Sequence, residues 1–115
     1  MARAATTSDI FNAVAEPRRR AILAFVAPCE RAVGEIVAHL QLEQPSVSKH
    51  LRVLKAVGLV DTRREGRSIL YRANGDAIRP LHEWTMTFER LWQHQLGRVK
   101  ERAEARAATD AKKEE

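Results

Sequence analysis

Residues 44–67, from Gln44 to Arg67, read QPSVSKHLRVLKAVGLVDTRREGR and contain the clearest structural pattern of the chain. The first half of this segment predicts a helix, because Val47, Leu51 and Leu54 recur at the spacing of one helical face. Gly58 predicts the end of that helix, since glycine readily adopts the left-handed conformation that terminates helices. Charged residues fill the positions between the apolar ones. The helix is therefore expected to have one face for a core and one for solvent.

A β-hairpin is predicted directly after this helix. Residues 59–64 and 67–73 are rich in Val, Thr, Ile, Leu and Tyr, the residue types that favour strands. Glu65-Gly66 lies between the two segments and supplies the turn. Because arginines bracket this turn, the tip of the hairpin is basic.

Three shorter helices are predicted upstream. The first is capped by Thr7 or Ser8 and ends at Glu16, because the residue before a proline is disfavoured in a helix. The second covers 17–28, with a proline in its first turn, and the third covers about 33–40. Residues 41–43 form a tight connection to the helix that opens at Pro45, so two helices and a turn precede the hairpin.

A long helical stretch is predicted downstream of the hairpin. Its apolar residues run from Ile78 to Val99, mostly in three- and four-residue steps, and Pro80 either begins the helix or kinks it. From residue 102 to 115 alanine and charged residues predominate, so this tail is expected to fray. The predicted fold is mainly α with a small β-hairpin, a winged helix-turn-helix in the order α-α-α-α-β-β-α. We expect one domain over 1–115, with a core of about 7–100.

The positive charge of the chain is concentrated in one segment. The formal net charge is +5, from 20 Lys and Arg against 15 Asp and Glu. Residues 44–72 hold seven basic and two acidic residues, whereas residues 1–43 and 73–115 are each neutral. A local excess of this kind is typical of a surface that binds nucleic acid.

Cysteine content and hydropathy exclude several other classes of protein. The single cysteine, Cys29, excludes a disulfide within the chain and a zinc site of several thiolates, and it fits a reducing cytosol. We expect a partly buried thiol there, with oxidation or a bridge between chains as alternatives. The longest apolar run, residues 21–27, is far shorter than the roughly 20 residues that span a bilayer. Residues 1–9 contain no apolar signal segment, so a cytoplasmic protein without a membrane segment is expected.

The candidate DNA contacts lie on the exposed face of the helix from Pro45 and on the hairpin tip. Gln44 stands at the helix start, where a glutamine can read adenine with two hydrogen bonds. The serines can bond bases or phosphates, the cations attract phosphate, and His50 suits a phosphate or base contact. The hairpin arginines suit the backbone or the minor groove. The predicted contacts are Gln44, Ser46, Ser48, Lys49, His50, Arg52, Lys55, Arg63, Arg64 and Arg67.

Each of these two features has an ordinary explanation when taken alone. A basic helix face is usually a solvated surface. Arginines at a hairpin tip also protect strand edges from pairing with another chain. The two features nevertheless follow one another directly between neutral flanks, and this conjunction favours nucleic-acid binding.

Five segments of the chain resemble the ArsR-type winged-helix repressors of bacteria. These segments are 16–23 (EPRRRAIL), 33–36 (VGEI), 44–54 (QPSVSKHLRVL), 58–60 (GLV) and 64–67 (REGR). The resemblance implies a homodimer, built from the first and last helices, that binds a palindromic operator in double-stranded DNA and represses transcription. One departure is Glu43, where the family often has a capping Ser or Thr. Glutamate is a weaker cap, and its charge lies near the expected phosphates.

Large apolar side chains concentrate on the last predicted helix. They can simply complete the core of a monomer, but two tryptophans and a phenylalanine exceed what a small core needs. A dimer seam with residues of the first helix beneath it explains them better. A two-fold dimer then presents two recognition helices to successive major grooves, which implies an inverted repeat. The predicted interface residues are Ile10, Phe11, Val14, Trp84, Phe88, Leu91, Trp92 and Leu96.

No metal and no cofactor is expected. The thiolate pair that relatives carry on the third helix falls at Ala32 and Gly34, which cannot bind metal. On the last helix Pro80 and Gly97 interrupt the ligand pattern around His82 and His94. These two histidines can still meet across a dimer, although surface histidines are far commoner.

An enzyme is not expected, because no phosphate loop, nucleophile–base pair or metal cluster is present. The alternative function is a winged-helix module that binds another protein through its aromatic C-terminal helix. Arg18, Arg19 and Arg20 crowd the start of a helix, where the dipole disfavours cations. They are expected to have a partner, either phosphate or an acid such as Glu16 or Glu35.

Overall fold

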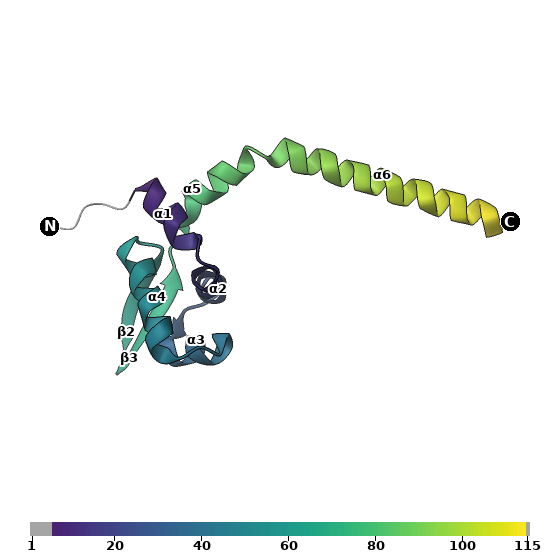
Figure 1. The fold of residues 1–115 in the computed structure, drawn as a ribbon. Helices are drawn as coiled ribbons and strands as arrows, with labels where there is room; N and C mark the ends of the chain where they lie inside the picture. The colour runs from purple at the N-terminus through teal and green to yellow at the C-terminus, as the bar shows by residue number, and fades with distance from the viewer. Residues whose placement is uncertain (1–5, 115) are drawn as a thin grey trace. The chain divides into compact units, whose positions relative to one another are not determined.

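The computed structural model describes residues 6–114, with side chains described to residue 111. Its contacts divide the chain into two units, Met1–Leu81 and His82–Glu115. The elements are α1 (Thr7–Val14), α2 (Pro17–Val26), β1 (Arg31–Ala32), α3 (Val33–Leu40), α4 (Gln44–Ala56), β2 (Val60–Glu65), β3 (Ser68–Ala73), α5 (Gly75–Met86) and α6 (Glu89–Glu114) (Figure 1).

The predicted winged helix-turn-helix is confirmed in the first unit. Helices α3 and α4 pack against each other and against α2, and the hairpin of β2 and β3 extends beside them (Figure 1). Gly58 has φ +81°, as expected for the residue that ends α4. The Leu59 N–H then bonds the Leu54 carbonyl at 2.9 Å, which leads the chain directly into β2.

The sheet contains one strand that the sequence did not predict. Strand β1 pairs antiparallel with β3, matching Arg31 with Tyr71 and Ala32 with Leu70. The strand order is therefore β1-β3-β2, and the element order gains a strand before α3. A strand of two residues has no alternation of apolar and polar side chains, so no periodic signal reveals it.

The turn of the hairpin lies one residue later than predicted. Glu65 pairs with Ser68, which leaves Gly66 and Arg67 as the two turn residues. Gly66 has φ +60° and Arg67 has a negative φ, the pattern of a two-residue turn with glycine first. The consequence is that Arg67 belongs to the turn itself rather than to the strand.

The core of the first unit gathers one apolar face from each helix. Helix α4 contributes the predicted stripe, and Leu59 and Val60 close the core from the start of the hairpin. The buried residues are Ile10, Ala13, Ile22, Leu23, Val26, Ile36, Val47, Leu51, Leu54, Leu59 and Val60.

Two of the three consecutive arginines of α2 bind the end of α1. Arg19 Nε donates to the Ala13 carbonyl at 2.6 Å, and an Arg20 guanidinium N–H donates to the Val14 carbonyl at 2.8 Å. The last carbonyls of a helix lack partners within the helix and carry its negative dipole end, so cations are favoured there. Within residues 6–114 the partners of these two side chains are thus main-chain carbonyls and not a carboxylate.

The start of α1 is also fixed by a side chain. Thr6 is the N-cap, in place of the predicted Thr7 or Ser8, and forms a capping box with Asp9. The Asp9 N–H donates to Thr6 Oγ1 at 3.3 Å, and the Thr6 N–H donates to Asp9 Oδ2 at 2.8 Å. Both ends of α1 are therefore satisfied locally.

The single long C-terminal helix predicted from the sequence is wrong, because the structure contains two helices. Helix α5 continues through Pro80 and ends at Met86, and α6 begins at Glu89. At the junction, Thr85 and Thr87 donate their hydroxyls to the His82 and Trp84 carbonyls at 2.9 and 2.7 Å. Such hydroxyls compete with the main-chain bonds of a helix, so the break falls at the threonines and not at the proline.

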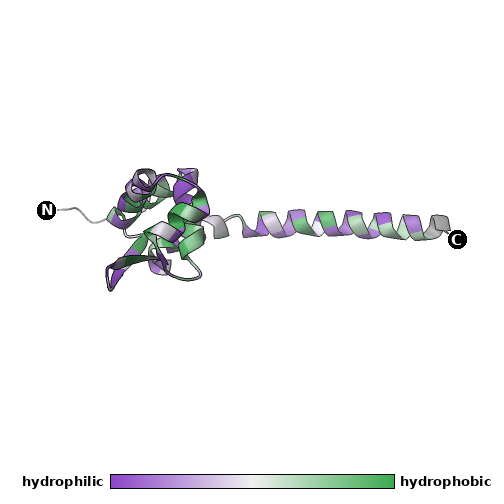
Figure 2. Cartoon of the chain, turned by 90° about the horizontal axis from the view of Figure 1, so that it is seen from below, coloured by the Kyte–Doolittle hydropathy of each residue, from purple (hydrophilic) through white to green (hydrophobic). Residues whose placement is uncertain are grey.

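Helix α6 presents both apolar and charged residues to solvent. Figure 2 shows hydrophobic and hydrophilic residues alternating along it. Leu91, Trp92, Leu96 and Val99 are 46–68% exposed, and every described side chain from residue 101 to 111 is exposed. The fraying expected for residues 102–115 stays a prediction. No helix in the described part of the chain is long and apolar enough to cross a bilayer.

Candidate nucleic-acid interface

A sharp turn between α3 and α4 sets the orientation of the candidate reading helix. Gln41 adopts the left-handed conformation (φ 54°, ψ 41°), and its N–H bonds the Val37 carbonyl at 2.9 Å. This conformation is uncommon for a residue with a side chain and usually marks a required chain reversal. The reversal lets α3 and α4 pack together while one face of α4 remains in solvent.

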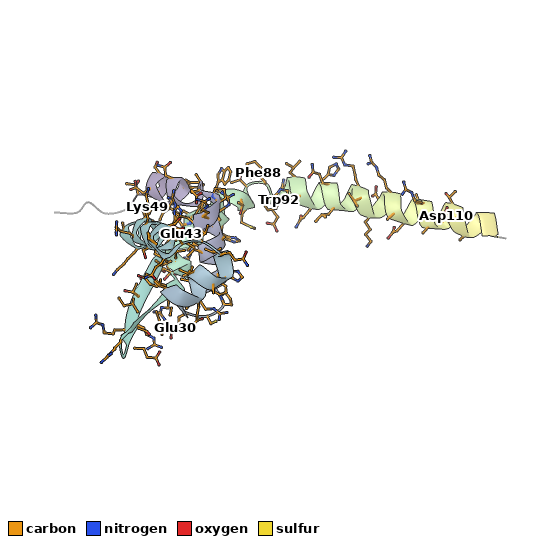
Figure 3. All side chains as sticks on the ribbon, turned by 60° about the horizontal axis from the view of Figure 1, so that its bottom comes forward. Glu30, Glu43, Lys49, Phe88, Trp92 and Asp110 are labelled. Carbon is orange, nitrogen blue, oxygen red and sulfur yellow. The ribbon has the colours of Figure 1, made fainter. Side chains whose placement is uncertain are left out.

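Helix α4 separates its buried and exposed residues as the sequence predicts. Lys49, Arg52 and Lys55 are exposed, opposite the buried apolar stripe. Figure 3 labels Lys49 on this helix. Ser46 and Ser48 are half-buried at the flanks of the exposed face. The helix therefore offers three accessible cations on one side.

The first turn of α4 has no hydrogen bond from a capping side chain in the described part of the chain. Glu43 is the N-cap, and within residues 6–114 no side chain hydrogen-bonds the first turn. This agrees with the expectation that glutamate caps weakly here. Gln44 is exposed at this end of the helix. N–H groups of the first turn thus remain available for an outside acceptor.

The three hairpin arginines occupy different surroundings. Arg63 and Arg64 are neighbours on β2, and successive strand residues point to opposite faces of a sheet. Arg64 and Arg67 are exposed, and no ion pair is formed by either within the described residues. Arg63, by contrast, is held by two acids.

Arg63 is fixed to the segment that precedes β1. Its Nε lies 2.9 and 2.8 Å from the two carboxylate oxygens of Glu30, and a terminal nitrogen also contacts the same carboxylate. Glu65 lies 3.1 Å from the same guanidinium. The hydrogen bonds from Arg63 hold the pKa of Glu30 below its usual value although burial opposes this, and the same bonds raise the pKa of Arg63. Arg63 therefore anchors the wing, a role that sequence reasoning missed because the two partners are 33 residues apart.

The start of α4 and the hairpin turn line one hollow of about 320 Å³. Gln44 contributes from the helix and Arg67 from the turn, so the structure brings these two predicted contacts together. Ile69, which is 43% exposed, also lies on this hollow. The other lining residues are Ala32, Val33, Gly34, Ser68 and Tyr71.

The side chain of His50 is largely buried, although the sequence predicts it as a DNA contact. It is only 13% exposed, and its Nε2 lies 4.0 Å from Glu16 Oε2. The structure thus places this imidazole against the start of α2.

The predicted dimer residues fall into a buried group and an exposed group. Ile10 is 5% exposed and belongs to the core of the first unit, while Phe11 and Val14 are half-buried. Phe88, Leu91, Trp92 and Leu96 are 38–68% exposed, and Trp84 is 53% exposed. Figure 3 labels Phe88 and Trp92 in the second unit. Trp84 packs edge-on against Phe88 with ring centroids 5.4 Å apart.

The histidines and the cysteine do not form a metal cluster in the part of the chain that the structure describes. No group of three or more His, Cys, Asp or Glu residues there is arranged to hold an ion. His82 and His94 are exposed in the second unit. Cys29 is a free thiol and is exposed, rather than partly buried as expected.

The fold and the basic face define the chain as a winged helix-turn-helix protein. Residues 16–62 match the family described as bacterial regulatory protein, arsR family. The chain is 30% identical over 81 residues to the transcriptional repressor SdpR of Bacillus subtilis, an alignment that covers 70% of this chain and 90% of that relative. It is 38% identical over 81 residues to the biofilm growth-associated repressor of Agrobacterium fabrum, covering 70% of this chain and 69% of that protein.

A solved structure supports the same assignment. The ArsR-like transcriptional regulator from Rhodococcus sp. RHA1 superposes with a TM-score of 0.65 at 26% identity, covering 85% of this chain and 90% of that one. The chain belongs to the ArsR family of bacterial regulatory proteins. It is a DNA-binding transcriptional regulator and not an enzyme.

Proposed function

We propose that the protein is a cytoplasmic homodimeric repressor that binds an inverted-repeat operator without sensing metal. The observation that carries this proposal is the set of accessible cations on α4 and the hairpin. Within the described residues, six cations of α4 and the hairpin have no ion-pair partner, and five of them belong to α4, the outer part of β2 and the turn; the sixth, Arg72, lies on β3. The five are Lys49, Arg52, Lys55, Arg64 and Arg67.

On the duplex, the cations and the polar residues of α4 are expected to have different roles. The lysines and arginines neutralise phosphates and fix the register of the protein without reading sequence. Gln44 and Ser46, at the start of α4, are the side chains placed to reach base edges in the major groove. Arg67 and Gln44 line the same hollow, so the hairpin and α4 are expected to contact adjacent parts of one DNA site.

The exposed apolar residues of the second unit support the dimer. Soluble monomers seldom expose large apolar side chains in a contiguous group. Phe88, Leu91, Trp92 and Leu96 lie within nine residues and are all exposed. A two-fold dimer presents two α4 helices to the duplex, so we expect the operator to be an inverted repeat.

The ligand positions of the chain support metal independence. Ala32 and Gly34 stand where the resemblance places a thiolate pair, and neither side chain binds metal. Two exposed histidines alone supply too few ligands for a closed structural site.

Selection from fragmented genomic DNA of the source organism tests the proposal. The purified protein is incubated with the fragments, and the bound ones are sequenced and footprinted. We expect an inverted repeat with half-site centres about 10 base pairs apart, upstream of a gene whose transcription rises when the regulator is deleted. A direct repeat, or transcription that falls on deletion, contradicts the repressor proposed here.

The effect of metal on DNA binding tests metal independence. The affinity for the operator should be unchanged after treatment with EDTA or after addition of Zn²⁺. Loss of binding with Zn²⁺ contradicts metal independence.

A further inference from the structure

His50 and Glu16 join the candidate reading helix to the start of α2. Glu16 is the N-cap of α2, and its Oε2 accepts the N–H groups of Arg18 at 2.7 Å and Arg19 at 3.1 Å. The His50 Nε2 faces this same oxygen from α4, at 4.0 Å. One carboxylate oxygen therefore serves both the cap of α2 and the contact with α4.

The surroundings of Glu16 keep it ionised. Partial burial opposes the charge, yet the N–H groups of Arg19 and Arg18 and the nearby His50 and Arg18 side chains hold the pKa of Glu16 below its usual value. A distance of 4.0 Å is too long for a direct hydrogen bond, so the contact with His50 is electrostatic.

The other ring nitrogen of His50 constrains the imidazole further. Nδ1 is buried and has no hydrogen-bond partner among the described residues. A buried donor without a partner is costly, whereas a buried ring nitrogen without a proton loses less. Nε2 is therefore the ring nitrogen on the side of Glu16, and Nδ1 is the one enclosed by the protein.

We propose that His50 is a positioning residue that acts on DNA binding through Glu16 and does not touch DNA. The inference rests on the proposed role of α4 as the reading helix. His50 lies next to Lys49 in sequence, but its side chain is 13% exposed and turned toward α2, while Lys49 is exposed. Holding α4 against the capped end of α2 fixes the angle at which its cations meet the phosphates.

The test uses two amide substitutions that differ in reach. Glutamine places an N–H group near the position of Nε2, whereas asparagine places one near Nδ1. Affinity for a fixed duplex is measured by fluorescence anisotropy over a range of salt concentrations, with folding checked by circular dichroism. We expect His50→Asn and His50→Leu to weaken binding about five- to tenfold. The salt slope, which is the slope of the logarithm of the association constant against the logarithm of the salt concentration, should stay unchanged. His50→Gln should restore binding to within about twofold of the native protein.

A second background shows whether His50 acts through Glu16. Glu16→Ser keeps an N-cap, because serine is a preferred capping residue, but it removes the carboxylate that faces His50. In that background His50→Asn should have no further effect on affinity. Three results would overturn the inference. His50→Asn weakens binding equally in both backgrounds, or it leaves binding unchanged in the native background. The third is that His50→Asn flattens the salt slope by about one unit per protomer, as the loss of a phosphate contact does.

Lys49→Ala, measured in parallel, separates this inference from the proposed function. If Lys49→Ala leaves affinity and salt slope unchanged, α4 is not the reading helix and both proposals fail. If Lys49→Ala flattens the slope while the His50→Asn loss is the same in the native and the Glu16→Ser backgrounds, only the positioning role fails.

Discussion

Arg63 and Arg64 are adjacent in the sequence and have different surroundings in the structure. Arg63 is bound by Glu30 and Glu65, whereas Arg64 has no ion-pair partner among the described residues. The same contrast separates Lys49, which is exposed, from His50, which is half-buried against Glu16. At the scale of a residue, a basic side chain is available to DNA only where no neighbouring acid already holds it.

Gln44 is expected to determine sequence preference. It is exposed at the start of α4, and a glutamine that pairs with adenine discriminates against other bases by about 1–3 kcal/mol. Gln44→Ala should therefore reduce the difference in affinity between the selected operator and single-base variants at one position of each half-site. Competition binding with such variants measures this. A uniform loss on every duplex would contradict base reading.

Arg19 is expected to contribute to stability through the end of α1. It donates to the Ala13 carbonyl at 2.6 Å and the Asn12 carbonyl at 3.3 Å. Arg19→Ala should lower the free energy of unfolding by about 1–2 kcal/mol, because charged donors form strong hydrogen bonds. Urea denaturation followed by circular dichroism measures the change. Arg18→Ala is the matched control and should leave stability nearly unchanged, since the Arg18 side chain is exposed.

At the scale of an element, the helices with a regular apolar spacing were predictable. A strand of two residues and a helix break caused by side-chain hydroxyls were not. The bounds expected for α3 match the structure, because Val33, Ile36 and Leu40 repeat on one face. Strand β1 has two residues and depends on pairing with β3, a contact between distant parts of the chain. The break between α5 and α6 was also missed, because Pro80 is an evident helix breaker in sequence and the hydroxyls of Thr85 and Thr87 are not.

The anchor between Glu30 and Arg63 predicts a loss of stability in acid. The pKa of Glu30 is lowered in the folded protein, so its contribution is present above the unfolded value of 4.5 and is lost as the pH falls through the folded value. Glu30→Gln should therefore lose less stability than the native protein between about pH 6 and about pH 3. Urea midpoints at the two pH values provide the comparison. Parallel losses in both proteins would show that this pair does not couple folding to pH.

At the scale of the whole molecule, the distribution of charge was more informative than its total. A net charge of +5 is modest, but its confinement to residues 44–72 predicted the basic face of α4 and the hairpin. The sequence did not reveal that Glu30 neutralises one of these cations, because that acid lies outside the segment. It also did not separate Ile10, which is buried, from the exposed apolar residues of α6.

The exposed apolar face of α6 is expected to hold the dimer together. Leu96→Asp should shift the protein from about twice 13.0 kDa toward the monomer mass and weaken operator binding, since a charge is placed in an apolar seam. Sedimentation equilibrium measures the mass. Arg90→Asp is the matched control, because the 100° step of a helix places residue 90 roughly opposite Trp92 and Val99. Dimers that persist in Leu96→Asp would place the interface elsewhere.

The salt dependence of DNA binding shows whether exposed cations of α4 and the hairpin meet the phosphates. The logarithm of the association constant for one duplex is plotted against the logarithm of the salt concentration for the native protein and for Lys49→Ala and Arg64→Ala. Each substitution should weaken binding to all duplexes alike and flatten the slope by about one unit per bound protomer. Slopes equal to that of the native protein in both variants would mean that neither side chain meets a phosphate.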